Sequence, residues 1–295
     1  MYVGTALLLA GCVAINTPPD PSAVFGENEQ VMTVSFLDVG QADCTLISLP
    51  DGKHILIDGG NVNDGELIAD YLKRQGIKKL DLMVATHPHE DHIGGLDDVL
   101  AATEVMKVYM PEISEKDMPT TKTYEYFIDA VLNEGCAVSP AKAGETVLKG
   151  EDYTLTCLSP AKTDIGDMNN YSVVLMLSFK DADFLFTGDA EKDIENEILK
   201  SGYNIDAEVI KVPHHGSDTS SSKKYLSAVT PYYAVISCGK DNSYGHPHAE
   251  VLERYNAVSA TVYRTDLQGT VIIATNGTEF NIINDTNLSL DGSKK

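Results

Sequence analysis

Ten residues, Thr86-His87-Pro88-His89-Glu90-Asp91-His92-Ile93-Gly94-Gly95, decide the fold and the chemistry of this chain. Three imidazoles and two carboxylates lie within six of them, and these are ligand types that zinc, manganese and iron accept. A loop can direct His87 and His89 toward one ion, and Asp91 and His92 toward a second. The alternative is a set of surface histidines and helix-capping acids, but three of the eight histidines would then fall here by chance. The stretch therefore predicts a site for two metal ions.

The residues around this stretch predict an alternation of strands and helices. A short apolar strand (80–85) leads into it, and a segment with helical spacing (93–101) follows. Further strands are expected at 31–37, 44–49, 54–57, 105–110, 153–158, 172–179, 184–187, 207–212 and 232–237, and further helices at 66–72, 124–132, 191–200, 221–228 and 249–255. We expect one α/β domain over residues 30–284. Two mixed sheets packed face to face with helices on both outer faces, an αββα sandwich, would bury such strands.

The C-terminal part carries two further expectations. Residues 261–264 and 269–274 read as the two strands of a final hairpin, and residues 285–295 read as a polar, frayed tail.

The N-terminal segment, residues 1–29, is expected to lie outside the fold. Its apolar run 6–10 is far shorter than the roughly 20 residues that a membrane-spanning helix needs. Leu9-Ala10-Gly11-Cys12 resembles the lipobox of bacterial lipoproteins, and residues 16–22 then read as a tether. A frayed, mildly apolar terminus is the alternative, since no Lys or Arg precedes the run. The resemblance implies a bacterial lipoprotein, anchored outside the cytoplasm through lipid on Cys12.

Composition excludes several classes of protein. The chain has 295 residues, with 22 basic against 44 acidic side chains and a net charge of −22, so it is no basic protein that coats nucleic acid. A hydrophobic fraction of 43% suits a soluble globular domain. Four further cysteines, Cys44, Cys136, Cys157 and Cys238, form no C-x-x-C pair, which argues against a structural zinc site. Their disulfide status stays open.

Residues 86–95 are called the metal loop below. The sequence resembles the metallo-β-lactamase superfamily, whose H-x-H-x-D-H signature is complete at residues 87–92 of this loop. The resemblance extends over residues 31–275. It implies that Asp58 supports the metal loop, that Asp189 of Phe186-Thr187-Gly188-Asp189 bridges the two ions, and that the late motif Val212-Pro213-His214-His215-Gly216-Ser217 supplies a ligand. His215 is favoured as that ligand, with His214 facing substrate or the second metal; the reverse assignment stays open.

Several other motifs look like the extracytoplasmic domain of ComEC-type DNA-uptake proteins, in a stand-alone form. They are residues 36–43, 169–175, 214–217, 245–248 and 265–269. The domain of that group is thought to be a nuclease, and the resemblance places Asp38 and Gln41 near the metals. This chain has Asn169-Asn170 where the superfamily has a middle histidine, so Asn170 is either an oxygen ligand of a weaker second site or a turn residue.

Three more residues are candidates for contacting substrate. His246 lies between Gly245 and Pro247, where a rigid loop could aim it at a substrate phosphate or a metal; an exposed loop histidine is the alternative. Lys211 and Ser217 flank the histidine pair and could contact a phosphate oxygen, although Lys211 could equally be solvated.

Together these features predict a metal-dependent hydrolase, with two ions of zinc or manganese activating a water molecule. Asp91 and Asp189 would hold this nucleophile, and Asp91 would accept its proton. The first hypothesis is a phosphodiesterase or nuclease that acts on DNA outside the membrane. The second is a hydrolase of a small phosphoester, such as phosphorylcholine on a cell-wall polymer, and the third an inactive binding lipoprotein. The charge of −22 weighs against tight binding of long DNA unless Lys211, Lys223, Lys224 and Arg264 form a basic patch. No stable protein partner is expected.

Overall fold

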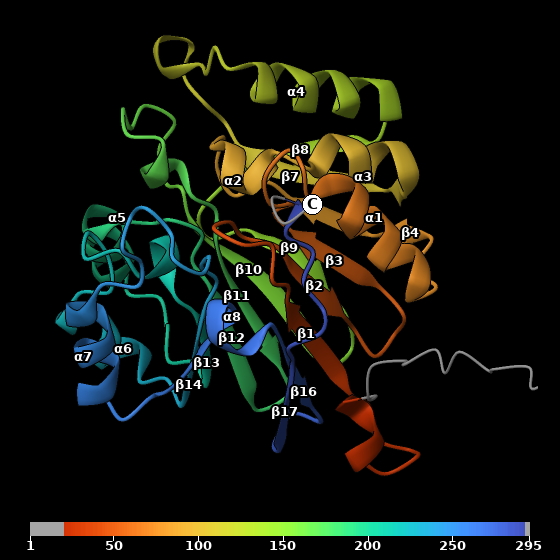
Figure 1. Ribbon diagram of the computed structural model, residues 1–295. Helices are drawn as coiled ribbons and strands as arrows, with labels where there is room; N and C mark the ends of the chain where they lie inside the picture. Colours follow the sequence, from red (N-terminus) through yellow and green to blue (C-terminus); the bar gives the residue numbers. More distant parts are fainter. Residues whose placement is uncertain (1–20, 293–295) are drawn as a thin grey trace, which may run out of the picture.

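The computed structural model describes residues 21–292, and these form the expected αββα sandwich (Figure 1). The predicted fold class is therefore confirmed. Cys12, the lipobox and most of the expected tether lie outside the described residues. A 3₁₀ turn, η1 (Pro21–Val24), contacts β16 and β17, so the end of the expected tether lies against the domain.

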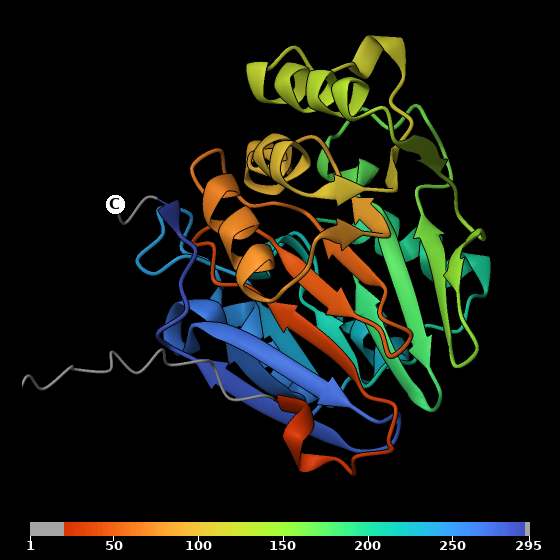
Figure 2. The same cartoon turned by 90° about the vertical axis from the view of Figure 1, so that its right-hand side faces the viewer.

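The first sheet has eight strands and the second has seven, and Figure 2 shows them from the side. In spatial order the first contains β17 (Phe280–Asp285), β16 (Thr270–Thr275), β1 (Met32–Phe36), β2 (Thr45–Ser48), β3 (His54–Ile57), β5 (Leu82–Val84), β7 (Lys107–Pro111) and β8 (Ala137–Ala141). The second contains β15 (Thr261–Arg264), β14 (Tyr233–Ile236), β13 (Val209–Lys211), β12 (Ala182–Phe186), β11 (Val174–Phe179), β10 (Tyr153–Ser159) and β9 (Thr146–Lys149). A separate pair joins β4 (Lys79–Leu80) to β6 (Glu104–Val105).

Helices cover the outer face of each sheet. In Figure 1, α1 (Gly65–Arg74), α3 (Leu96–Ala102) and α4 (Lys122–Glu134) lie over the first sheet, and α5 (Lys192–Ser201), α6 (Lys223–Val229) and α7 (Ala249–Ala257) lie beside the second. Short elements complete the fold: α2 (Glu90–Ile93), α8 (Thr265–Gln268), η2 (Glu115–Asp117), η3 (Asn169–Tyr171) and η4 (Pro213–Gly216). Among the helices of residues 21–292, none is both long and apolar enough to cross a membrane.

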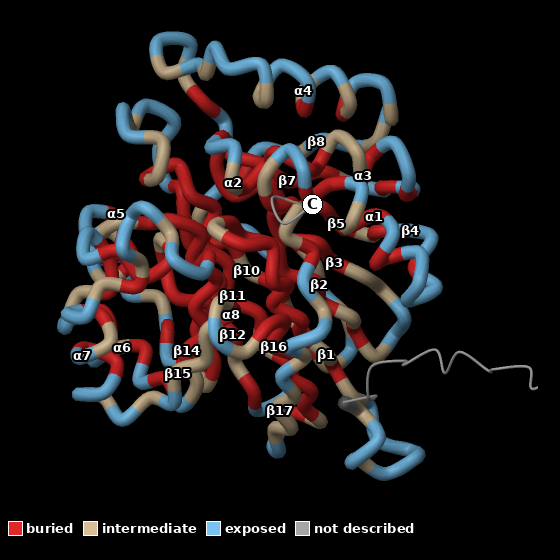
Figure 3. Tube along the Cα trace, in the orientation of Figure 1, coloured by how far each residue is buried: buried red, intermediate tan, exposed pale blue. Residues whose placement is uncertain are grey.

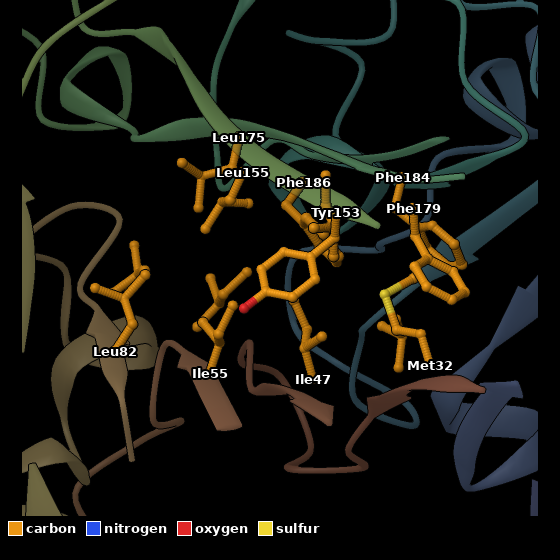
Figure 4. Packing of buried hydrophobic residues seen from close by; sticks show 14 of the residues in the cluster. Met32, Ile47, Ile55, Leu82, Tyr153, Leu155, Leu175, Phe179, Phe184 and Phe186 are labelled. Atoms are coloured by element: carbon orange, nitrogen blue, oxygen red, sulfur yellow. The ribbon is translucent and has the colours of Figure 1, made fainter. Parts of the chain in front are cut away.

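Side-chain alternation along the strands builds three apolar layers. On β3, Ile55 and Ile57 point between the sheets and Leu56 points toward the helices, as the two-residue period of a strand requires. Figure 4 shows the layer between the sheets, in which Ile47 and Ile55 face Leu155 and Leu175. Buried segments converge on the two sheets while the outer surfaces of the helices are exposed (Figure 3).

Two expectations for the C-terminal part are wrong. Residues 261–264 and 270–275 form no hairpin, because β15 pairs with β14 in the second sheet whereas β16 pairs with β1 in the first. The short helix α8 carries the chain across. Residues 285–292 are not frayed: Leu290 is only 2% exposed and donates its N–H to the Asp38 carbonyl, and the N–H of Gly292 binds Asp64.

The docked tail gives a stability prediction. Replacing buried Leu290 by alanine should lower the free energy of unfolding by about 2–5 kcal/mol, the usual cost of removing a buried leucine side chain. Leu267→Ala is the matched control, because Leu267 is 65% exposed and should change stability by no more than about 0.5 kcal/mol. Urea denaturation measures both, and equal small effects would show that the tail is not part of the folded unit.

Candidate metal centre

The chemistry-bearing loops meet at one end of the sandwich, beyond the carboxyl ends of parallel strands. In the first sheet β3 and β5 run parallel, and in the second β12, β13 and β14 do. Open α/β sheets bind ligands at this end because the loops of neighbouring strands converge there. Asp58 follows β3, the stretch 86–92 follows β5, Asp189 follows β12, His214 and His215 lie in η4 after β13, and His246 lies beyond β14.

Asp58 anchors the metal loop from beneath. It is buried and accepts three hydrogen bonds of 2.8 Å each, from the backbone N–H and the hydroxyl of Thr86 and from Nδ1 of His92. Because Asp58 engages Nδ1 of His92, Nε2 is the ring nitrogen that faces the centre of the site, where it can bind a cation once it has lost any proton it carries. Asp58 therefore lies in the supporting position that the sequence predicts for it.

His215 is oriented in the same way from the second sheet. Its Nδ1 donates to the carbonyl of Ser237 at 3.0 Å, which leaves Nε2 directed at the carboxylates of Asp91 (3.2 Å) and Asp189 (3.6 Å). His214 and His215 both have φ of +51°, a left-handed conformation that non-glycine residues seldom adopt. Such strain is typical of functional sites, and here it turns two consecutive imidazoles toward one cleft.

Four residues form a compact candidate ligand set: Asp91, His92, Asp189 and His215. The closest ligand-atom pairs are 3.2 to 3.6 Å apart, His92 Nε2 lying 3.3 Å from Asp189 Oδ1. A tetrahedron with bonds of about 2.1 Å has edges of roughly 3.4 Å, so these spacings suit one divalent ion. Nε2 of His92 and Oδ1 of Asp189 are buried with no hydrogen-bond partner. Such orphaned atoms are what a site built for a cation requires.

The other predicted metal-binding group, around His87 and His89, has longer distances between its ligand atoms and Asp189. Nε2 of His87 lies 3.1 Å from Nδ1 of His89 and 3.9 Å from Oδ2 of Asp189, and Nε2 of His214 is 3.8 Å from the same oxygen. Asp189 therefore faces both groups, as a bridging carboxylate must. The amide oxygen of Asn169 is also buried without a hydrogen-bond partner. Two ions, the second more weakly held, and their identity as zinc or manganese stay predictions.

Burial and mutual attraction set the charges of the site. Burial opposes the ionised forms of Asp91 and Asp189, but His92 and His215 outweigh it and lower the pKa of both carboxyls. Burial lowers the pKa of His246 to about 4, with His215 and His214 contributing. Against burial, the neighbouring carboxylates raise the pKa of His92 and raise the pKa of His215 to about 10. At neutral pH the carboxylates are therefore ionised and His246 is neutral, while a cation that binds His92 and His215 would displace a proton from each ring.

An open pocket of about 310 Å³ gives access to these groups. It is lined by Gln41, His89, Glu90, Asp91, Asn169, Asp189, His214, His215, Tyr244 and His246. The predicted candidates His89, Asp91, Asp189, His214, His215 and His246 therefore share one cavity.

Two supporting residues lie elsewhere than expected. Lys211 is neither solvated nor directed at a substrate, because it is buried and paired with Asp43 at 2.7 Å. The hydroxyl of Ser217 is turned to Thr219, whose hydroxyl meets Nδ1 of His214, and Ser217 does not line the pocket. Two others lie outside the pocket lining. Asn170 lies in η3 and accepts from the N–H of Glu191, which agrees with its alternative as a turn residue. Asp38 accepts from the N–H of Gly40, and its supporting role stays a prediction.

Sequence reasoning missed two residues. Asp43 is buried between Lys211 and His215, with one oxygen 3.3 Å from Nδ1 of His215. Its place in the run 36–43 was the available signal. Tyr244 stacks on His246 at the mouth of the pocket, and only its position two residues before that histidine could have indicated it.

The shared carboxylate can be tested directly. Asp189→Asn keeps the size of the side chain and removes its charge, so two cations would face each other with less neutralisation and at least one should dissociate. Elemental analysis after dialysis measures the ions per chain, with Asp193→Asn on the exposed side of α5 as the matched control. Unchanged metal content in Asp189→Asn would show that this carboxylate is not a ligand.

Comparison with known proteins agrees with this geometry. The profile of the Metallo-beta-lactamase superfamily matches residues 37–240. The chain is 33% identical over 255 residues to ComE operon protein 3 of Bacillus subtilis (strain 168), covering 81% of this chain and 32% of that protein. It is 33% identical over 269 residues to Competence protein ComA of Neisseria gonorrhoeae, covering 89% and 34%. The chain thus spans about a third of the length of these curated relatives.

Solved structures confirm the fold. The metallo-beta-lactamase fold protein YhfI from Bacillus subtilis superposes with a TM-score of 0.54 at 13% identity, covering 83% of this chain and 100% of that one. Profile, relatives and fold agree with the assembled metal ligands, and the chain belongs to the Metallo-beta-lactamase superfamily.

Proposed function

We propose that this protein, a metal-dependent hydrolase of its superfamily, is a phosphodiesterase that cleaves DNA outside the membrane. The buried cluster around Asp189, open to the pocket through Asp91 and His89, carries the proposal. One of the two relatives above, Competence protein ComA, is named for competence, which is a process on DNA. An inactive binding module would not need so complete a ligand set with its orphaned acceptor atoms.

Divalent ions held by this ligand set lower the pKa of a water molecule and neutralise charge on a phosphate. Asp91 is suited to hold the attacking water, because its carboxylate is partly exposed and lines the pocket. We also assign it as the acceptor of the water's proton, a role in which its lowered pKa makes it a weak base. The chain's remaining task is to orient the phosphodiester toward this carboxylate.

His246 is suited to that task. The Gln41 amide oxygen accepts from the N–H of Gly239 at 3.0 Å, so its amide nitrogen faces Nδ1 of His246 at 3.4 Å. Gln41 therefore donates and Nδ1 accepts, which places the ring proton on Nε2. From the wall of the pocket, that N–H can donate to a phosphate oxygen.

The distribution of charge limits the form of the substrate. Of the four cations considered for a basic patch, Lys211 is buried against Asp43 and Arg264 is paired with Asp266. Lys223 and Lys224 remain exposed on α6, and the pocket lining contains neither lysine nor arginine. Since non-specific affinity for duplex DNA is built from such cations, we expect cleavage of single strands or ends. The same lining keeps a small phosphoester, such as a phosphorylcholine ester, as the second candidate.

The substrate assignment is tested by hydrolysis. The metal-loaded protein should cleave a single-stranded oligonucleotide, lose activity on chelation and regain it on return of metal. His246→Ala should lower kcat/KM by roughly 10-fold to 150-fold, the cost of one hydrogen bond to a charged group, and leave metal content unchanged. His54→Ala, at the start of β3 beside Ser48, is the control. Loss of metal from His246→Ala would make this residue a ligand instead, and hydrolysis of phosphorylcholine esters alone would replace the DNA assignment.

We also propose that the protein is anchored outside the membrane through lipid on Cys12. When it is expressed in a bacterium behind a complete leader, mass spectrometry should find Cys12 acylated and the protein in the membrane fraction. Cys12→Ser should move the protein out of that fraction without changing hydrolysis, since the site is built from residues of the folded domain. Unmodified Cys12 in such material would contradict the anchor.

A further inference from the structure

Three aromatic rings form a ladder from the metal centre to the mouth of the pocket. The His215 and His246 rings are nearly parallel, with centroids 6.2 Å apart and planes at 24°. The His246 and Tyr244 rings are stacked too, with centroids 5.6 Å apart and planes at 19°. The innermost ring belongs to the ligand set and the outermost to the pocket wall. The proposed chemistry gives no role to this outermost ring.

The loop that carries the ladder is held in place by side-chain hydrogen bonds. The Asn242 side chain accepts from the N–H of His246 at 3.0 Å and donates to the carbonyls of Gly239 and His246. Gln41 binds both the N–H of Gly239 and the His246 ring. Tyr244 lies within this closed loop, so its ring is positioned before any ligand arrives and loses little freedom on binding.

Tyr244 presents an apolar surface to solvent. It is 67% exposed although it stacks on His246 and lines the pocket. Proteins that bind single-stranded nucleic acid combine cationic grooves with aromatic rings on which bases stack. In this pocket lining there are no lysines or arginines, so the aromatic contribution must carry more of the affinity.

We propose that Tyr244 is the stacking platform for a nucleobase close to the scissile phosphate, and hence a specificity-determining residue. The inference rests on the proposed phosphodiesterase activity and narrows its substrate to strands that carry bases. A planar ligand suits the ladder, because its rings lie within 24° of parallel and a base would continue the same arrangement. A choline-type cation also binds aromatic faces, but it needs no such parallel series.

Two substrates with the same phosphates separate stacking from phosphate binding: a single-stranded oligonucleotide and an abasic strand of equal length. Tyr244→Ala should raise KM for the base-bearing strand by roughly 5-fold to 150-fold, and change KM for the abasic strand by no more than about threefold. Tyr244→Phe retains the ring and should behave like the wild type. Tyr232→Ala is the matched control, since Tyr232 is 64% exposed and lies outside the pocket lining. Equal losses on both strands, or a defect in Tyr244→Phe as large as in Tyr244→Ala, would overturn the platform.

A binding measurement separates this inference from the proposed function. The probe is 2-aminopurine deoxyribonucleoside monophosphate, which contains no phosphodiester and whose fluorescence is quenched on stacking. The metal-loaded wild type and Tyr244→Phe should quench it, and Tyr244→Ala should bind it more weakly by the same 5-fold to 150-fold. If the wild type cleaves neither strand but shows this ring-dependent quenching, the phosphodiesterase fails and the platform stands. If the wild type cleaves DNA while Tyr244→Ala binds the probe like the wild type, the stacking platform is wrong and the phosphodiesterase activity stands. The platform is also wrong if Tyr244→Ala impairs only the hydrolysis of phosphorylcholine esters.

Discussion

The metal centre depends on the hydrogen bonds that Asp58 accepts. This buried carboxylate joins the end of β3 to Thr86 and to His92 on α2, so it determines both the path of the loop and the direction in which His92 presents Nε2. Gly95 allows the approach, because a Cβ there would lie 2.5 Å from the carbonyl oxygen of Gly59. Partners of this kind commonly alter metal affinity 10-fold to 100-fold, although they never touch the ion.

Lys211, at the end of β13 in the second sheet, and Asp43, in the loop between β1 and β2 of the first sheet, supply the matching support for His215. A buried lysine is costly unless it is paired, and here its ammonium lies 2.7 Å from a carboxylate that also meets His215. Lys211 and His215 lower the pKa of Asp43 to about 2 against the opposing effect of burial. Asp43 thus stays ionised and places a negative charge behind the imidazole, whose Nδ1 proton is donated to the carbonyl of Ser237. The two sheets each contribute one carboxylate-supported histidine, which explains why the site lies at their junction.

Local sequence patterns predicted the layers, most elements and the H-x-H-x-D-H loop, because strand alternation, helical spacing and motif spacing are properties of short segments. They failed where pairing partners are distant in the chain. The strands 261–264 and 270–275 look like a hairpin locally, yet each has a better partner in a different sheet. Leu290 is buried although its neighbours are polar, and Lys211 is charged yet buried because Asp43 lies 168 positions earlier in the chain but only 2.7 Å away in space. Such charge pairs and ring stacks depend on tertiary contacts, so the stacking of Tyr244 on His246 could not be predicted from local patterns either.

The protein is acidic although its proposed substrate, DNA, is a polyanion. The position of the charged groups in the protein explains how the two can be compatible. A net charge of −22 raises the concentration of divalent cations near the surface and so favours loading of the metal centre, while it repels a long polyanion. Attraction for phosphate would then be confined to the predicted ions and to His246, in an open pocket whose wall carries Glu90 and no lysine or arginine. Such a substrate would be bound at one phosphate and one neighbouring group, rather than along a groove. Its affinity should accordingly depend less on salt than that of proteins that coat DNA, because few counterions are released when few cationic side chains contact the backbone.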